Sequence, residues 1–128
     1  MQVIGYVRVS TEEQVRDGVS LAIQRGEIDA YVLVKDWTLM KIIADEGMSA
    51  KSLNRPGLQE LMALVEGRRV QAVIVYKLDR LTRSVKELNT LVELFDKRGV
   101  AVVSLQESLD ATTATGRLMM NLLASVSQ

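Results

Sequence analysis

The sequence contains no cysteine and no histidine. Without cysteine, disulfides, thiol nucleophiles and thiolate metal sites are all excluded. Without histidine, the Ser-His-Asp arrangement, most zinc sites and the commonest general base near neutral pH are excluded as well. Any catalysis by this chain must therefore use Ser, Thr, Tyr, Asp, Glu, Lys or Arg side chains.

Long apolar runs and an excess of charge of one sign are missing too. No stretch approaches the ~20 apolar residues of a membrane span, and the start lacks the layout of a secretory signal, so we expect a cytoplasmic protein with no membrane contact. The 16 basic residues balance the 16 acidic ones, so overall charge does not indicate a nucleic-acid partner. Only residues 77–86 are locally basic, with Lys77, Arg80, Arg83 and Lys86 against Asp79.

Strand-like and helix-like segments alternate along the 128 residues, which suffice for one domain, 1–128. Apolar and β-branched runs predict strands at 3–9, 38–44, 70–76 and 100–105, and helical periodicity predicts helices at 20–35, 56–67, 84–99 and from 115 onward. This order predicts an α/β domain with a mainly parallel central sheet and helices on both faces. The last helix is still periodic at Gln128, so we expect it to be the truncated start of a longer one.

The end of the first strand brings an arginine and a hydroxyl together. Tyr6, Arg8 and Ser10 alternate by two, so their side chains should point to the same side of the strand. Ser10, Asp45 and Lys77 each follow a predicted strand, and the carboxyl ends of parallel strands share one edge of a sheet. We therefore expect these three loops to meet.

Arginines from three segments should converge on the same edge. Arg80 and Arg83 are three apart, so a helical turn would place them on one face, and Arg55 precedes Pro56 at the start of a helix. The planar arginine fork binds phosphate oxygens bidentately and stays charged. Four arginines around the Ser10 hydroxyl describe a phosphoryl-transfer site with Ser10 as nucleophile. Asp79, between Lys77 and Arg80, is the candidate carboxylate for proton transfer.

The ordered motifs resemble those of the serine recombinase family, also called resolvases and invertases, over essentially the whole chain. They are Tyr6-Val7-Arg8-Val9-Ser10-Thr11; Ser20-Leu21 with Gln24; Asp45 with Gly47 and Ser49; Arg55-Pro56-Gly57-Leu58; Tyr76 to Ser84; and Thr115-Gly116-Arg117-Leu118. The loop with Gln14 and Asp17-Gly18 is more similar to the integrase and transposase branch than to the small resolvases.

The resemblance implies that Ser10 attacks a DNA phosphodiester, forms a 5′-phosphoserine link and religates the strands after exchange, with neither metal nor cofactor. It implies that Arg8, Arg80 and Arg83 bind the scissile phosphate. The residues that would complete the site are Tyr6, Gln24, Asp45, Ser49, Arg55, Lys77 and Asp79. It further implies double-stranded DNA as substrate, a homodimer or tetramer as the working form, dimerisation through the helix that starts near residue 115, and a DNA-binding region that is absent here.

Other interpretations remain open at this point. Taken alone, Ser10 would be a cap or turn hydroxyl. The basic segment 77–86, taken alone, would be the solvent-exposed start of a helix. A nucleotide-binding α/β domain is possible by fold, although Ser10-Thr11-Glu12-Glu13 stands where a glycine-rich phosphate loop would follow the first strand. A catalytically silent assembly module that only touches the DNA backbone is the other alternative.

Overall fold

A computed structural model describes residues 1–11, 19–47 and 53–126. Within these ranges the strands form a single sheet in the order β2-β1-β3-β4-β5. They are β1 (Gln2–Val9), β2 (Thr38–Glu46), β3 (Ala72–Val75), β4 (Ala101–Ser104) and β5 (Leu109–Asp110). The first four are mutually parallel, and β5 is antiparallel to β4.

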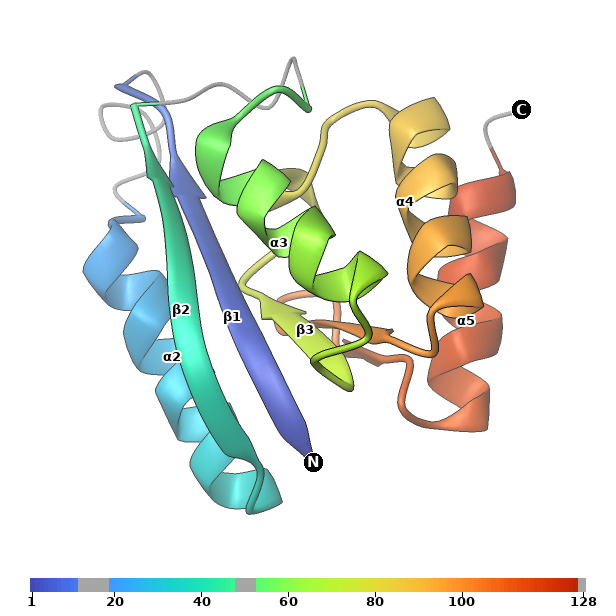
Figure 1. Cartoon of the computed structure of the whole chain (residues 1–128), viewed down its shortest axis with the longest axis horizontal. Coiled ribbons are helices and arrows are strands. Elements are labelled where there is room, and N and C mark those ends of the chain that lie inside the picture. The colour runs from blue at the N-terminus through green and yellow to red at the C-terminus, as the bar shows by residue number, and fades with distance from the viewer. Residues whose placement is uncertain (12–18, 48–52, 127–128) are drawn as a thin grey trace.

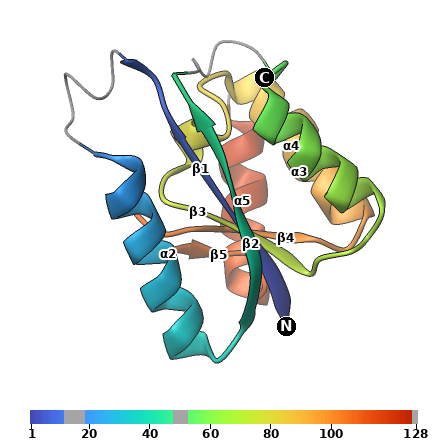
Figure 2. The ribbon, with the colours of Figure 1, turned by 60° about the vertical axis from the view of Figure 1, so that its left-hand side comes forward.

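Helices cover both faces of this sheet (Figures 1 and 2). They are α2 (Leu21–Lys35), α3 (Pro56–Glu66), α4 (Val85–Lys97) and α5 (Ala114–Ser125), with a short 3₁₀ helix η1 (Leu78–Arg80) after β3. One face carries α2, the opposite face carries α3 and α4, and α5 packs against α4 and β5. The predicted α/β class with a mainly parallel sheet is confirmed.

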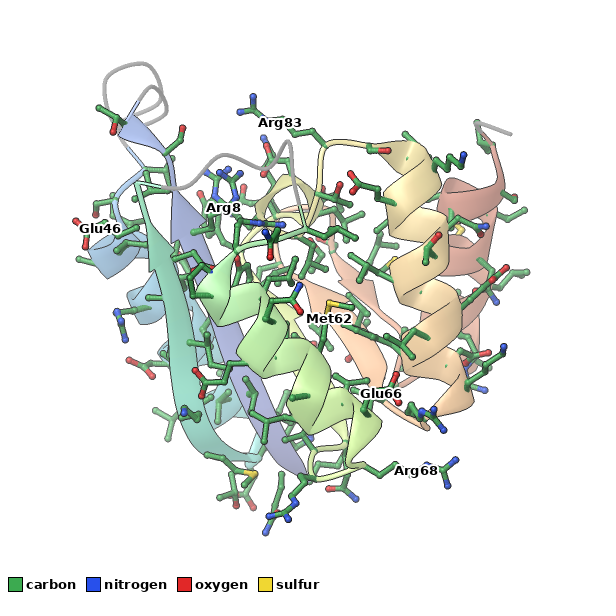
Figure 3. All side chains as sticks on the ribbon, turned by 45° about the horizontal axis from the view of Figure 1, so that its top comes forward. Arg8, Glu46, Met62, Glu66, Arg68 and Arg83 are labelled. Carbon is green, nitrogen blue, oxygen red and sulfur yellow. The ribbon has the colours of Figure 1, made fainter. Side chains whose placement is uncertain are left out.

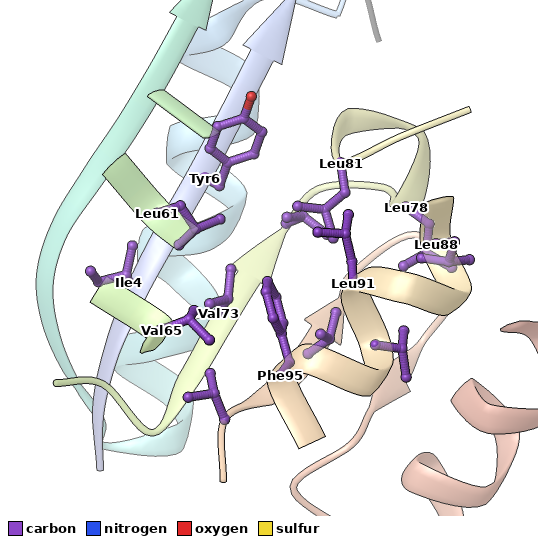
Figure 4. Packing of buried hydrophobic residues seen from close by; sticks show 14 of the residues in the cluster. Ile4, Tyr6, Leu61, Val65, Val73, Leu78, Leu81, Leu88, Leu91 and Phe95 are labelled. Atoms are coloured by element: carbon purple, nitrogen blue, oxygen red, sulfur yellow. The ribbon is translucent and has the colours of Figure 1, made fainter. Parts of the chain in front are cut away.

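Alternation along β1 sorts its side chains between two cores. Ile4 and Tyr6 belong to the larger core beneath α3 and α4, whereas Val3 and Val7 belong to the smaller core beneath α2. Figure 4 shows Ile4 and Tyr6 beside Leu61 of α3. By the same period of two, Arg8 lies on the side of Tyr6. The alternation therefore directs both polar side chains toward α3.

Parallel pairing aligns the strand ends that carry the candidate residues. β1 pairs with β2 up to Val9 opposite Glu46, so Asp45 lies within a strand two residues longer than predicted. β3 stops at Val75, opposite Tyr6, and leads directly toward η1. The segments that begin at Ser10, Gly47 and Tyr76 thus leave the same edge of the sheet, as expected.

The helix starts follow the sequence closely. Ser20 caps α2 by accepting from the Ile23 N–H, and Ser84 caps α4 by accepting from the Glu87 N–H. Thr113 caps α5, which begins one residue earlier than predicted. No helix in the described ranges is both long and apolar enough to cross a membrane.

Candidate active site

Three arginines are buried at the carboxyl edge of the sheet. Arg8 is fully buried, and Arg55 and Arg80 are each 2 % exposed. Arg8 comes from β1, Arg55 from the N-cap position of α3 and Arg80 from η1. Figure 3 shows Arg8 inside this edge of the molecule. A buried guanidinium needs hydrogen-bond partners, and here the main chain supplies several of them.

Arg8 and Arg55 both donate hydrogen bonds to the carbonyls of η1 and the residue after it. Arg8 Nε lies 3.1 Å from the Arg80 carbonyl oxygen, and Arg8 Nη2 lies 2.8 Å from that of Asp79. Arg55 Nη1 lies 3.0 Å from the Arg80 carbonyl oxygen, and Arg55 Nη2 donates to that of Leu81. The last carbonyls of a helix lack partners within it, so the two arginines fix this turn in place.

Asp45 caps α3 from the neighbouring strand. Its carboxylate accepts from the Gly57 N–H at 2.8 Å and from the Leu58 N–H at 2.9 Å, while the N-cap residue Arg55 makes no side-chain cap. A Cβ on Gly57 would lie 2.7 Å from Asp45 Oδ2, closer than real Cβ contacts. The glycine of the Arg55-Pro56-Gly57-Leu58 motif therefore makes room for this carboxylate.

Tyr6 links Asp45 to Arg55. Its hydroxyl donates to Asp45 Oδ2 at 2.6 Å and accepts from Arg55 Nη1 at 3.1 Å. Burial, assisted by the hydrogen bond to Asp45, raises the pKa of Tyr6 far above its ordinary value. Burial lowers the pKa of Arg55. Tyr6 is therefore a neutral hydrogen-bond donor, and it is not suited to act as a base.

Gln24 of α2 holds the main chain of Arg8. The Arg8 N–H donates to Gln24 Oε1 at 3.2 Å, and Gln24 Nε2 donates to the Arg8 carbonyl at 2.9 Å. Because β3 ends opposite Tyr6, the amide of Gln24 takes the place that a further strand residue would occupy beside Arg8. Gln24 thus supports the main chain of Arg8 through these two hydrogen bonds.

The expected helical turn does not extend over both Arg80 and Arg83. η1 ends at Arg80, the next residue Leu81 is buried, and Arg83 is exposed (Figure 3). Asp79 is half-buried, and its Oδ1 accepts from Arg80 Nη1 at 2.8 Å. η1 is a 3₁₀ turn of three residues, so Arg83 belongs to the segment that follows it.

The other predicted site residues differ in where they lie and whether the structure describes them. Ser10 directly follows β1 at this edge and is half-buried, and Lys77 is exposed at the N-cap of η1. Ser49 and the turn at Asp17-Gly18 lie outside the described residues. The described part of the chain contains no group of three acidic, histidine or cysteine side chains that could hold a metal ion.

Sequence reasoning missed two supports of the turn. Thr82 accepts from the Ser84 N–H and donates to Glu87. Glu107, after β4, accepts from the Leu78 N–H at 3.3 Å and from the Ser104 hydroxyl. The contact of Glu87 could have been predicted from the sequence, because Ser84-x-x-Glu87 fits a capping box. The contact of Glu107 could not have been predicted, because its partner Leu78 is 29 residues away.

The buried guanidiniums of the site are suited to bind an anion. Three buried guanidiniums gather here with the carboxylates of Asp45 and Asp79, and Glu87 also acts on Arg55. Guanidinium groups match the planar oxygens of phosphate, and a buried setting strengthens the attraction. The arrangement can therefore stabilise negative charge near Ser10.

Known proteins resemble this chain over nearly its whole length. A family model described as "Resolvase, N terminal domain" matches residues 3–128. The resolvase of transposon Tn917 from Enterococcus faecalis is 35% identical over 126 residues, which cover 98% of this chain and 61% of that protein. The DNA-invertase of Escherichia phage P1 is 34% identical over 125 residues, covering 98% and 60%. The chain thus spans about three-fifths of the length of these relatives.

Solved structures share the fold as well. The N-terminal catalytic domain of TP901-1 integrase matches with a TM-score of 0.90 and 35% identity, covering 98% of this chain and 93% of that chain. A resolvase-family site-specific recombinase from Streptococcus pneumoniae matches with a TM-score of 0.82 and 26% identity, covering 99% and 85%.

Proposed function

This chain belongs to the serine recombinase family, and we propose that it is a catalytic domain that cuts and rejoins double-stranded DNA through Ser10. The observation that carries the proposal is the set of buried arginines at the sheet edge where Ser10 leaves β1. This edge offers a hydroxyl beside concentrated positive charge, which is what attack on a phosphodiester requires.

In the proposed reaction the Ser10 hydroxyl oxygen attacks the phosphorus of a DNA phosphodiester. A bond forms between this oxygen and phosphorus, and the bond from phosphorus to the 3′ oxygen breaks. The Ser10 hydroxyl gives up its proton and the leaving 3′ oxygen takes one up, so the products are a 5′-phosphoserine and a free 3′ hydroxyl. Rejoining reverses these steps with a 3′ hydroxyl as nucleophile. The ester is exchanged, never hydrolysed, so no energy-supplying cofactor is needed.

The arginines and one carboxylate divide the remaining work in this proposal. Arg8, Arg80 and Arg83 bind the nonbridging oxygens and offset the charge that develops on them. Asp79, held beside Arg80 at 2.8 Å, takes part in proton transfer. Gln24, Asp45, Arg55 and Tyr6 keep the arginine-bearing elements in register. Lys77 and Ser49 are assigned to supporting contacts with the DNA backbone.

We also propose that the protein works as a dimer or tetramer through α5. Apolar side chains are exposed on this helix and just beyond it, namely Leu118, Met119, Leu122, Leu123 and Val126. Apolar side chains gathered at this spacing on one exposed helix are typical of an interface. The exchange of strands between two duplexes also requires more than one active site.

The test is to trap the reaction of the full-length protein on supercoiled DNA that carries its recombination site. We expect protein attached covalently to 5′ ends, and we expect Ser10→Ala to abolish this adduct. Thr90→Ala is the control, because the Thr90 hydroxyl bonds the Lys86 carbonyl within α4 and contacts none of the proposed site residues. An adduct that survives in Ser10→Ala would show that Ser10 is not the nucleophile.

A further inference from the structure

A buried hydroxyl holds the segment between η1 and α4. Thr82 is only 5 % exposed, and its hydroxyl oxygen accepts from the Ser84 N–H at 3.0 Å. The same hydroxyl donates to Glu87 Oε1 at 3.1 Å. Ser84 in turn accepts from the Glu87 N–H at 3.2 Å. Thr82, Ser84 and Glu87 thus form a closed ring of hydrogen bonds, which we call the Thr82 ring.

The Thr82 ring departs from an ordinary capping box. In that motif the carboxylate at Glu87 would accept from the N–H of Ser84 directly. Here the Thr82 hydroxyl accepts a hydrogen bond from this N–H and donates its own hydrogen bond to the carboxylate. The sequence pattern predicts the cap of α4, and it does not predict that the residue two positions before the cap becomes part of it.

Arg83 is enclosed between two members of the ring. The bond from the Ser84 N–H to the Thr82 hydroxyl spans the main chain of Arg83, so it restricts the direction in which the Arg83 side chain leaves. On the preceding side, Arg8 and Arg55 hold the carbonyls of Asp79, Arg80 and Leu81. The exposed side chain of Arg83 therefore extends from a main chain that buried groups fix on both sides (Figure 3).

We propose that Thr82 is a positioning residue for Arg83, and that its hydroxyl aims the Arg83 guanidinium at the DNA phosphate that Ser10 attacks. This rests on the function proposed above and names a further residue of the same site. A charged group aimed before the substrate arrives needs no reorganisation during the reaction, whereas a displacement of about 1 Å can cost roughly 100-fold in rate.

The first experiment compares three threonine variants of the full-length protein. Thr82→Val keeps the shape of the side chain and loses the ring, and Thr82→Ser keeps the hydroxyl. We expect Thr82→Val to slow formation of the Ser10 adduct by roughly 10- to 100-fold at saturating DNA, with unchanged DNA affinity, and Thr82→Ser to restore the rate. Thr90→Val is the matched control, because the Thr90 hydroxyl only bonds the Lys86 carbonyl within α4.

The second experiment asks whether Thr82 acts through Arg83. Thr82→Val is introduced into the Arg83→Ala background, and slow adduct formation is followed on a nicked substrate that makes cleavage irreversible. We expect no further slowing there, because the side chain to be positioned is gone. If Thr82→Val slows the reaction by the same factor in both backgrounds, Thr82 does not position Arg83. Partial unfolding would lower the final amount of adduct, whereas a misplaced Arg83 would lower the rate constant. The two effects can therefore be told apart.

The two proposals fail in different ways. If the adduct persists in Ser10→Ala, the proposed function is wrong and the role of Thr82 falls with it. If the adduct depends on Ser10 while Thr82→Val has the wild-type rate, or acts independently of Arg83, only the positioning role is overturned.

Discussion

Individual buried arginines in this protein support the main chain as well as the proposed chemistry. Arg8 and Arg55 converge on the same Arg80 carbonyl oxygen, at 3.1 and 3.0 Å. Removing either side chain withdraws a donor from a buried acceptor, which costs stability in addition to charge. Arg83 differs, because its side chain is exposed. Substituting a buried arginine should therefore lower both the stability and the cleavage rate, whereas substituting Arg83 should lower the cleavage rate alone.

We expect Arg8→Ala to lower the free energy of unfolding by about 1–3 kcal/mol, because the Asp79 carbonyl loses its charged donor and the Arg80 carbonyl keeps only the one from Arg55. Arg83→Ala should lower it by at most about 0.5 kcal/mol. Both variants should form the Ser10 adduct at least about 100-fold more slowly. Urea unfolding and trapped cleavage measure the two effects. Equal destabilisation by both variants would contradict the support assigned to Arg8.

The sequence predicted which residues lie near one another at the site, but several of their hydrogen bonds were missed. The period of two placed Tyr6 and Arg8 on one side of β1, and the parallel sheet placed Asp45 at the same edge. The bond from Gln24 to the Arg8 main chain could not be predicted, because it depends on where β3 ends. Such contacts follow from register, which local sequence does not specify.

Secondary-structure elements here are joined by side chains that reach across from a neighbour. The start of α3 takes its cap from Asp45 of β2, so the strand and the helix are fixed relative to each other. The start of α5 lies even closer to β5, since a Cβ on Gly116 would lie 1.8 Å from the Asp110 carbonyl oxygen. Glycine at these two positions permits an approach that any side chain would prevent.

Gly57 and Gly26 provide a test of that argument on two helices. Alanine favours an α-helix over glycine by about 0.8–1 kcal/mol, so Gly26→Ala in α2 should stabilise the protein, since nothing lies within 4 Å of its Cβ. Gly57→Ala should destabilise it by about 1–3 kcal/mol, because the Asp45 carboxylate is displaced from its three donors. Denaturant unfolding of both variants gives the comparison. Stabilisation by Gly57→Ala would show that the Asp45 cap is dispensable.

The order and type of the main elements could be predicted from periodicity, and the helices predicted from 20 and 84 begin directly after the caps Ser20 and Ser84. Strand β5 was missed because two residues are too few to display a period. The 3₁₀ turn η1 was expected as a longer helical turn, but it ends at Arg80, and Arg83 lies in the segment after it. Short elements depend on tertiary partners such as Arg8 and Glu107, which lie far away in the sequence.

The whole molecule separates its proposed chemistry from its proposed assembly surface. The arginine-rich edge lies at the carboxyl ends of β1, β2 and β3, whereas α5 packs on α4 and β5 at the other end of the strand order. Figure 1 shows α5 on the far side of α4 from β1. Contact between copies through α5 would therefore leave the Ser10 edge open to DNA.

Two exposed leucines, one on α5 and one on α2, test whether copies associate specifically through α5 or through non-specific hydrophobic contacts. Leu122 of α5 is 50 % exposed and Leu33 of α2 is 82 % exposed. Burial of apolar surface contributes roughly 25 cal/mol per Å², so a charge at the centre of an interface weakens association strongly. In sedimentation velocity over a concentration series, we expect the unsubstituted protein to associate and Leu122→Glu to shift it toward monomer. Leu33→Glu should leave association unchanged despite its greater exposure. Equal effects of the two substitutions, or none from Leu122→Glu, would mean that copies do not meet through α5.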